Sequence, residues 1–257
     1  MPLLFDLSDH VATLTLDRPS DANAIDLGLA RELMEAAIRC SEDREVRAVV
    51  ITGAGRFFCA GGDLKSFAAH GDGLPAHLKE VTTYLHAAVS RLARMDAPVV
   101  AAVNGAAAGA GMSLACACDF VFAAESARFT MAYTRAGLTP DGSSTYFLPR
   151  IIGFKRALDL ALTNRTLAAG EALDWGLVAR VVPDATLLEE ARTFAKGLAA
   201  GPTGAFGSTK RLLHSGFTST LETQMEQETL AIADAARGAE GREGIVAFLE
   251  KRPPRFM

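Results

Sequence analysis

The sequence has little cysteine, few aromatic residues and no excess of positive charge. Its 257 residues include four Cys and one Trp, and the formal net charge is −4. A negatively charged chain lacks the basic surface that attracts nucleic-acid phosphates, so we expect no nucleic-acid partner. The His and Cys residues do not have the spacing of metal ligands, so we also expect no metal site.

A secretory signal is not recognisable at the N-terminus, because the first nine residues lack a basic region followed by an apolar one. The four cysteines are Cys40, Cys59, Cys116 and Cys118, and they form no C-x-x-C pair. Buried, reduced thiols are the ordinary expectation for such residues. Together these features predict a cytoplasmic location.

One stretch lacks charge for long enough to cross a bilayer, because no charged residue lies between Asp96 and Asp119. This stretch is mostly Ala, Gly and Val, has one Leu and no Ile or Phe, and contains Asn104. Such a composition favours a buried strand followed by a tightly packed helix start. We therefore expect no membrane span and no membrane partner.

The first 150 to 200 residues show strand and helix patterns in alternation. Val11–Leu16 alternates like a half-buried strand, and Asp26 is expected to cap a helix with an apolar stripe that includes Ile38. Residues 46–52 and 98–103 are typical of buried strands, and residues 76–95 of a long helix. Strands joined by such long connections pair in parallel through right-handed crossovers.

From about residue 155 the pattern becomes almost entirely helical. One β-like segment, residues 178–182, interrupts helices that are expected near residues 156–162, 187–198, 209–212, 221–236 and 243–250. We therefore divide the chain into an α/β core, residues 1–200, and a C-terminal helical region, residues 201–257. The helical region is small and amphipathic, so we expect it to pack on another subunit.

Two glycine-rich segments, residues 52–65 and 101–115, each follow a predicted buried strand and lead into a predicted helix. Glycine allows close approach of two backbones, and a helix N-terminus leaves N–H donors unpaired. Two such donors that converge on one oxygen could stabilise an oxyanion. The alternative is that these glycines only permit tight packing of strand and helix. Neither a P-loop nor a G-x-G-x-x-G fingerprint is present.

The residues of these segments resemble the crotonase (enoyl-CoA hydratase/isomerase) superfamily. Residues 58–65, Phe-Cys-Ala-Gly-Gly-Asp-Leu-Lys, and residues 98–111 are similar to its two signatures. Arg18-Pro19 with Asn23-Ala24 resembles its early substrate-binding loop, and Thr166 with residues 172–178 its later helix–turn segment. The resemblance covers nearly the whole chain. It implies an α/β fold, a crotonase-like spiral of ββα units with a C-terminal helical region, and homotrimers or dimers of trimers.

The same resemblance implies an acyl-CoA thioester as substrate, with no cofactor beyond the CoA moiety. It places an oxyanion hole at the backbone N–H groups of Gly62 and Ala110. The family more often has Gly at the second position, and a backbone donor survives the change to Ala unless that residue needs a positive φ. The implied lining of the CoA arm consists of Ala24, Ala60, Asp63 and Leu64, with Arg18 or Lys65 near the phosphates.

The acid and base residues decide the reaction, since the fold alone does not. Where hydratases of the family carry two glutamates, this chain has Ser113 and Tyr133, and neither supplies a carboxylate base. Asp141 instead resembles the Asp of family members that shift double bonds, such as dienoyl-CoA isomerases and the isomerase of the epoxyphenylacetyl-CoA pathway. We therefore predict isomerisation of an enoyl-CoA-type thioester by Asp141, in fatty-acid or aromatic-acid degradation. Ordinary capping of the next helix is the alternative role for this residue.

Three other functions stay open. The chain could be an enoyl-CoA hydratase, or a non-catalytic acyl-CoA-binding protein. It could also resemble 4-chlorobenzoyl-CoA dehalogenase, with Asp141 as nucleophile, Tyr133 as aromatic donor and His86 as the base that activates water. Tyr133 and His86 are accordingly expected at the substrate pocket.

Overall fold

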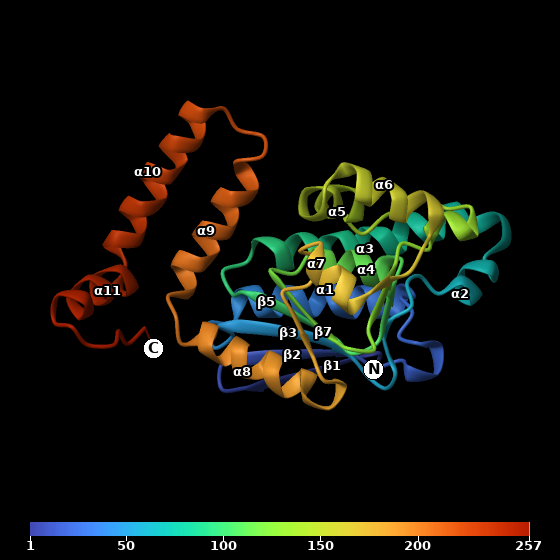
Figure 1. The fold of residues 1–257 in the computed structure, drawn as a ribbon, viewed down its shortest axis with the longest axis horizontal. Coiled ribbons are helices and arrows are strands. Elements are labelled where there is room, and N and C mark those ends of the chain that lie inside the picture. The colour runs from blue at the N-terminus through green and yellow to red at the C-terminus, as the bar shows by residue number, and fades with distance from the viewer. Residues whose placement is uncertain (257) are drawn as a thin grey trace.

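A six-stranded sheet forms the centre of the body in the computed structural model, which describes residues 1–256 (Figure 1). Its strands lie in the order β1-β2-β3-β5-β7-β10. The first pair is antiparallel and every later pair is parallel. The strand bounds are β1 Leu3–Ser8, β2 Val11–Leu16, β3 Ala48–Gly53, β5 Val99–Val103, β7 Phe120–Ala124 and β10 Arg180–Val182.

The two central strands are buried along their whole length, which explains their uninterrupted runs of Val, Ile and Ala. They pair in parallel, with Ile51 opposite Ala101. Helix α8 (Leu187–Ala199) covers one face of the sheet, and α1 (Leu27–Glu42), α3 (Leu74–Arg94) and α4 (Ala110–Cys116) lie on the other (Figure 1). The predicted buried strands and the parallel pairing are confirmed.

A second, smaller sheet has the order β4-β6-β8-β9. Its strands are β4 Phe57–Cys59, β6 Ala106–Ala108, β8 Arg128–Thr130 and β9 Leu167–Ala168. Strands β4, β6 and β8 each come directly after a strand of the large sheet, namely β3, β5 and β7. Each such pair of strands is followed by a helix, and the expected spiral of ββα units is confirmed.

The other helices of the described chain are short in the body and long at the C-terminal end. They are α2 Leu64–Ala68, α5 Ser144–Ile152, α6 Phe154–Thr163, α7 Ala169–Asp174, α9 Thr203–Ser215, α10 Leu221–Arg237 and α11 Ala239–Leu249, with 3₁₀ turns at η1 Pro19–Asp21, η2 Gly71–Gly73, η3 Tyr133–Ala136 and η4 Asp184–Thr186. Helices α9 to α11 extend away from the body as an arm (Figure 1). The boundary that we drew at residue 200 falls between α8 and α9.

The predictions for α1 and for the long helix α3 are confirmed, with one exception. Asp26 caps α1, because its Oδ1 accepts the Leu29 N–H at 2.8 Å. The long helix appears as α3. The assignment of Ile38 to the apolar stripe is wrong, since this side chain is 43% exposed. The predicted stripe residues Leu29, Leu33 and Ala37 are buried. Small residues on the same face, such as Ala30, let the helix approach α3 closely.

The uncharged stretch between Asp96 and Asp119 forms β5, β6 and α4. Among residues 1–256 no helix is both long enough and apolar enough to span a membrane. The four cysteines are unpaired, and three of them are buried. Burial raises the pKa of the Cys40, Cys59 and Cys116 thiols to about 12.

Gly111 lets the start of α4 lie directly on β4. A Cβ atom added at Gly111 would lie 2.3 Å from the carbonyl oxygen of Cys59, which is a backbone atom and has no freedom to rotate away. The absence of a side chain at this position therefore sets how closely α4 approaches the loop that follows β4.

We predict that Gly111→Ala lowers the free energy of unfolding by about 1–3 kcal/mol, because the methyl group forces α4 and β4 apart. Urea unfolding at fixed protein concentration measures this change. Gly170→Ala is the matched control, since a Cβ atom at Gly170 meets nothing within 4 Å. An unchanged unfolding midpoint for Gly111→Ala would show that the two elements are free to separate.

Candidate active site

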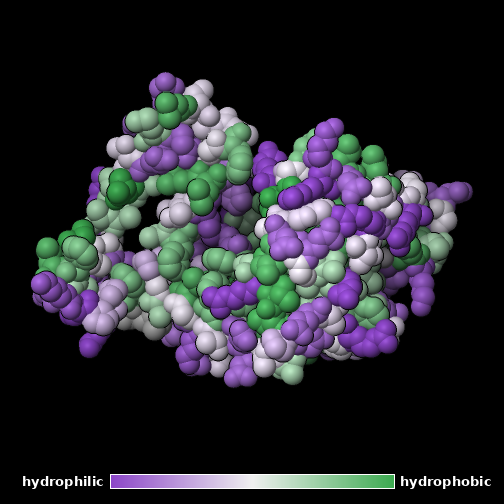
Figure 2. Space-filling model, in the orientation of Figure 1, coloured by the Kyte–Doolittle hydropathy of each residue, from purple (hydrophilic) through white to green (hydrophobic). Residues whose placement is uncertain are grey.

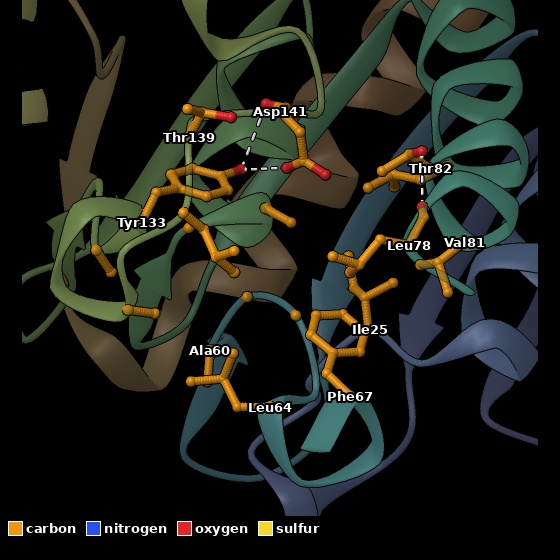
Figure 3. Close-up of a pocket in the computed structure, with 18 of the residues that line it drawn as sticks. Ile25, Ala60, Leu64, Phe67, Leu78, Val81, Thr82, Tyr133, Thr139 and Asp141 are labelled. Atoms are coloured by element: carbon orange, nitrogen blue, oxygen red, sulfur yellow. Dashed lines mark hydrogen bonds between the residues drawn. The ribbon is translucent and has the colours of Figure 1, made fainter. Parts of the chain in front are cut away.

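A cavity of about 300 Å³ opens between the two glycine-rich segments and α3 (Figure 3). One wall consists of apolar side chains from α2 and α3: Leu64, Phe67, Leu78, Val81 and Leu85. The opposite wall carries polar groups from η3 and the loop that follows it, namely Tyr133, Thr139 and Asp141. The cavity thus has an apolar side and a side with one carboxylate.

The two glycine-rich segments meet at the floor of the cavity, backbone against backbone. A Cβ atom added at Gly61 would lie 3.0 Å from the Ala108 carbonyl oxygen and 3.5 Å from the Ala110 nitrogen. A Cβ atom at Gly109 would lie 3.5 Å from the Gly61 Cα. Gly61 and Gly109 both have positive φ, +102° and +49°. Glycine is therefore required at both positions for the segments to come together.

Ala110 is the first residue of α4, so its N–H has no acceptor within the helix. The positive φ of this turn falls on Gly109, the N-cap residue, and Ala110 is not among the residues with positive φ. The alanine is consequently compatible with the local backbone. Ala110 is one of the residues that line the cavity.

Gly62 also lines the cavity, and its N–H makes no hydrogen bond within residues 1–256. The residues on either side of it are paired with Ile25. The Ile25 N–H donates to the Gly61 carbonyl at 2.7 Å, and the Asp63 N–H donates to the Ile25 carbonyl at 3.0 Å. Two unpaired backbone donors, at Gly62 and Ala110, therefore stand together beside the cavity. Such a pair is suited to hold a developing negative charge on oxygen.

Asp141 lies half-buried on the polar wall and is tied to Tyr133. The Tyr133 hydroxyl donates to Asp141 Oδ1 at 2.6 Å (Figure 3). The same hydroxyl oxygen lies 2.8 Å from Ser113 Oγ, which is also 3.2 Å from the Gly109 carbonyl oxygen. A chain of hydroxyl groups therefore runs from the start of α4 to the carboxylate. Asp141 Oδ2 makes no hydrogen bond within the described residues.

The alternative role of Asp141, capping of the next helix by its side chain, is not observed. The N-cap of α5 is Ser143, which has a φ of 74°. The side chain of Asp141 does not bond to the helix, whereas its carbonyl oxygen accepts the Ser144 N–H and hydroxyl at 3.2 and 3.0 Å. The Asp141 backbone carbonyl therefore binds the start of α5, whereas the Asp141 carboxylate binds Tyr133 and borders the cavity.

Burial raises the pKa of the Tyr133 phenol, and the nearby Asp141 carboxylate raises it further. Tyr133 accordingly stays protonated over the whole physiological range. It acts as a hydrogen-bond donor to Asp141 and not as a base. This arrangement fixes one carboxylate oxygen and leaves the other free.

The other predicted site residues are divided between the cavity and its surroundings. Ala60 and Leu64 line the cavity, whereas Ala24 and Asp63 do not. Ala24 is buried, and the Asp63 carboxylate accepts the Ser66 N–H at the start of α2. Within residues 1–256 no cluster of three or more His, Cys, Asp or Glu side chains is placed to hold a metal ion.

His86 lies on the exposed side of α3 and does not line the cavity. Its Nε2 accepts the Gly142 N–H at 3.1 Å, which assigns the ring proton to Nδ1. His86 therefore holds the residue that follows Asp141. Its nitrogen lone pair on that side is already engaged.

The apolar wall of the cavity was not predicted from the sequence. Leu78, Val81 and Leu85 recur at helical spacing, so they were recognisable as one face of a long helix. That spacing is the same for a helix that lines a cavity and for one that packs into a core. Ile25 and Thr139, which also contact the cavity, stand in loops without any periodic signal.

Comparisons with known proteins find similarity to the same family by sequence and by structure. The family model of enoyl-CoA hydratase/isomerase matches residues 6–257. A protein of Rhodobacter capsulatus named probable enoyl-CoA hydratase is 43% identical over 252 residues, which cover 98% of this chain and 96% of that protein. The 1,2-epoxyphenylacetyl-CoA isomerase of Escherichia coli is 41% identical over 255 residues, which cover 99% of this chain and 97% of that protein. The crystal structure of an enoyl-CoA hydratase from Polaromonas sp. JS666 superposes with a TM-score of 0.94 at 36% identity, covering 98% of each chain.

We predict that the Tyr133 phenol stays protonated at pH values at which an ordinary tyrosine, with a pKa near 10, has ionised, because burial and the Asp141 carboxylate raise its pKa. Since the folded-state pKa is raised, this group stabilises the fold fully below about pH 10 and loses that effect as the pH rises further. The phenolate absorbance of the folded protein, minus that of Tyr133→Phe, isolates the step. A difference that develops around pH 10 would contradict the buried donor role.

Proposed function

The chain belongs to the enoyl-CoA hydratase/isomerase family, and we propose that it isomerises a double bond in an enoyl-CoA-type thioester with Asp141 as the proton carrier. The observation that carries this proposal is the position of Asp141. It is the single carboxylate among the described residues that line the cavity, and Gly62 and Ala110 line the same cavity. The similarity over nearly the whole chain to a protein named 1,2-epoxyphenylacetyl-CoA isomerase supports an isomerase that acts on an acyl-CoA.

The thioester carbonyl would lie against Gly62 and Ala110 and accept both N–H groups. Its acyl chain would extend between the apolar wall of α2 and α3 and the polar wall of η3. A carbonyl held by two donors is polarised, which makes the protons of the neighbouring carbon more acidic. Because the donors are already in place before the substrate arrives, the site needs little rearrangement when charge develops on the oxygen.

In the proposed reaction Asp141 Oδ2 removes a proton from C2 of a 3-enoyl thioester. The electron pair of the broken C–H bond spreads over the acyl chain and the carbonyl oxygen, which gives a dienolate held by Gly62 and Ala110. The protonated Asp141 then returns the proton to C4, and a 2-enoyl thioester results. No water is consumed, so one carboxylate is sufficient for both steps.

Tyr133 supports this role by orienting the carboxylate. Its hydroxyl donates to Asp141 Oδ1 and so restricts the rotation of the carboxylate. Oδ2 is then the oxygen that faces the substrate. Ser113, which lies next to the Tyr133 hydroxyl, holds the donor in its place.

Hydration of an enoyl-CoA has less support from the site, although several relatives are named probable enoyl-CoA hydratases. Water addition needs one group to activate water and another to protonate the adjacent carbon. The candidate positions for such groups hold Ser113 and Tyr133, whose hydroxyls are engaged with each other and with Asp141. Only one carboxylate remains for two tasks.

Hydrolytic dehalogenation has less support for a different reason. It requires a base that activates water next to an Asp141 ester. His86 is the candidate for that base, but its Nε2 accepts the Gly142 N–H and the residue does not line the cavity. The base would have to break a hydrogen bond and turn before it could act.

We predict that Asp141→Asn lowers the rate of double-bond migration roughly 10²- to 10⁴-fold, because the amide cannot take up a proton. Migration is measured with 2- and 3-enoyl-CoA thioesters and with ring-bearing acyl-CoAs, together with exchange of acyl protons into heavy water. Asp174→Asn, an exposed position at the end of α7, is the matched control and should keep full activity.

Full activity of Asp141→Asn would remove this residue from the mechanism. Formation of a hydroxyacyl-CoA would favour the hydratase instead, and release of halide from a haloaryl-CoA would favour the dehalogenase. Saturable binding of acyl-CoA thioesters without turnover of any of them would favour a binding protein.

We also propose that the arm of α9 to α11 packs against further copies of the chain in a trimer or a dimer of trimers. No residue of α10 is buried in the described chain, and large apolar side chains lie exposed along the arm (Figure 2). Phe248 is 83% exposed, and Met225 and Ile232 are exposed as well. Apolar surface of this kind marks an interface in most soluble proteins.

We predict a trimeric or hexameric mass by sedimentation and dissociation to smaller species for the double variant Met225→Asp, Ile232→Asp, because each carboxylate would be buried without a partner. Glu226→Gln, on the same helix, is the control and should leave the mass unchanged. A wild-type chain that sediments as a monomer would refute the proposed assembly.

A further inference from the structure

The guanidinium of Arg18 lies among three carboxylates next to the candidate oxyanion hole. Its Nη2 is 2.9 Å from Asp63 Oδ2, 3.3 Å from Asp26 Oδ2 and 3.5 Å from Asp21 Oδ2. Its Nη1 donates to the carbonyl oxygen of Ala24 at 2.5 Å. The side chain is only 17% exposed. A single arginine therefore joins residues 21–26 to the residue that follows Gly62.

The same two segments are paired through their backbones. Ile25 and Gly62 form an isolated parallel bridge. In this bridge the Ile25 N–H donates to the Gly61 carbonyl, and the Ile25 carbonyl accepts the Asp63 N–H. In an extended segment, neighbouring residues point their backbone groups to opposite sides. Since Gly61 and Asp63 face Ile25 with these groups, the N–H of Gly62 faces the other side, where the cavity lies. The bridge thus sets the direction of a candidate oxyanion donor.

We propose that Arg18 is a positioning residue for the Gly62 N–H and does not contact the CoA phosphates. It clamps the bridge by binding Ala24 on one side and Asp63 on the other. This inference rests on the proposed oxyanion role of Gly62.

Electrostatics supports the clamp and opposes a phosphate contact. Burial raises the pKa of Asp63, but hydrogen bonds from the Ser66 N–H and from Arg18 outweigh it and hold the pKa of this carboxyl below its usual range. Three ionised carboxylates around one guanidinium leave a net negative charge, which would repel a phosphate group. Without Arg18 the carboxylates would also repel one another, and the two segments would separate.

The clamp reaches the cavity through a second route. Asp63 Oδ1 accepts the Ser66 N–H at 3.0 Å and so begins α2. That helix carries Phe67, whose ring lies against Gly62: a Cβ atom added at Gly62 would be 2.6 Å from Phe67 Cε2. Asp63 therefore links Arg18 both to the Gly62 backbone and to the side chain that packs on it.

Lysine cannot replace Arg18 in this arrangement. The guanidinium donates from two separate nitrogens, one to Ala24 and one to Asp63, in a fixed planar geometry. A lysine ammonium is a single point donor on a flexible stem. Arg18→Lys keeps the charge and is expected to keep the ion pairs while it loses the fork that spans the bridge.

The test uses the full-length chain as wild type, Arg18→Gln and Arg18→Lys, with Arg44→Gln at an exposed position as the matched control. Three readouts separate positioning from binding. They are the infrared carbonyl stretch of a bound, isotope-labelled saturated acyl-CoA, the Kd of a CoA thioether that lacks the carbonyl, and the kcat and KM of isomerisation. The saturated thioester cannot react, so its carbonyl reports the oxyanion hole alone.

We expect Arg18→Gln to lose at least half of the carbonyl shift that the wild type causes and to lower kcat roughly 10- to 100-fold, which is less than complete removal of an oxyanion donor. The Kd of the thioether should stay within about twofold, since the CoA contacts are intact. Arg18→Lys should fall between wild type and Arg18→Gln in both carbonyl shift and kcat. Arg44→Gln should match wild type in every readout.

A wild-type carbonyl shift and kcat in Arg18→Gln would overturn the inference. Weaker thioether binding with an unchanged carbonyl shift would overturn it in favour of a phosphate contact. If Arg18→Gln does not fold, Arg18→Lys decides, and wild-type values in that variant overturn the clamp. If the wild type causes no carbonyl shift, the oxyanion role of Gly62 fails and the inference with it. If the wild type shifts the carbonyl stretch of the bound thioester but does not isomerise any substrate, only the proposed reaction is refuted.

Discussion

At Gly61 and Gly111 the backbone of one glycine-rich segment lies against the backbone of the other, and an added Cβ atom would lie 3.0 Å and 2.3 Å from a carbonyl oxygen. This close approach brings the N–H of Gly62 and the N–H of Ala110 to the same cavity. Either donor alone is an ordinary unpaired backbone group. Together they can hold the oxygen of a thioester, because two donors aimed at one atom offset the cost of placing charge there. The spiral of ββα units produces this arrangement. Because β3 pairs with β5 and β4 pairs with β6, the two glycine-rich segments lie side by side.

The candidate oxyanion donors and the proposed proton carrier come from different parts of the fold. Gly62 and Ala110 contribute backbone groups, which survive most substitutions. Asp141, Tyr133 and Ser113 contribute side chains, and each is open to replacement without a change in the spiral. In this chain a hydroxyl network takes the positions at which the resemblance places two glutamates, and a single carboxylate remains beside it. A reaction in which a proton leaves and returns fits one carboxylate better than a reaction that also has to activate water.

Much of the fold was predictable from local patterns, because buried strands, apolar helix faces and caps each leave a periodic or positional signal. Val99–Val103 and the Asp26 cap are examples. Strands of three residues such as Phe57–Cys59 leave no period to detect, so the second sheet did not emerge from the sequence. The bridge from Ile25 to Gly62 and the bond from Tyr133 to Asp141 join irregular segments. No spacing rule connects such residues, and only the assembled fold brings them together.

The cavity is rigid on one side and adjustable on the other. Its floor is a contact between backbones, in which Gly61 and Gly109 have positive φ angles that would strain any other residue. Its apolar wall consists of side chains on α2 and α3, and these can change size while the helices stay in place. We therefore expect acyl-group specificity to follow Phe67, Leu78 and Val81, whereas polarisation of the thioester follows the backbone. A chain built in this way can change its substrate without rebuilding the group that activates it, since the two tasks depend on different atoms.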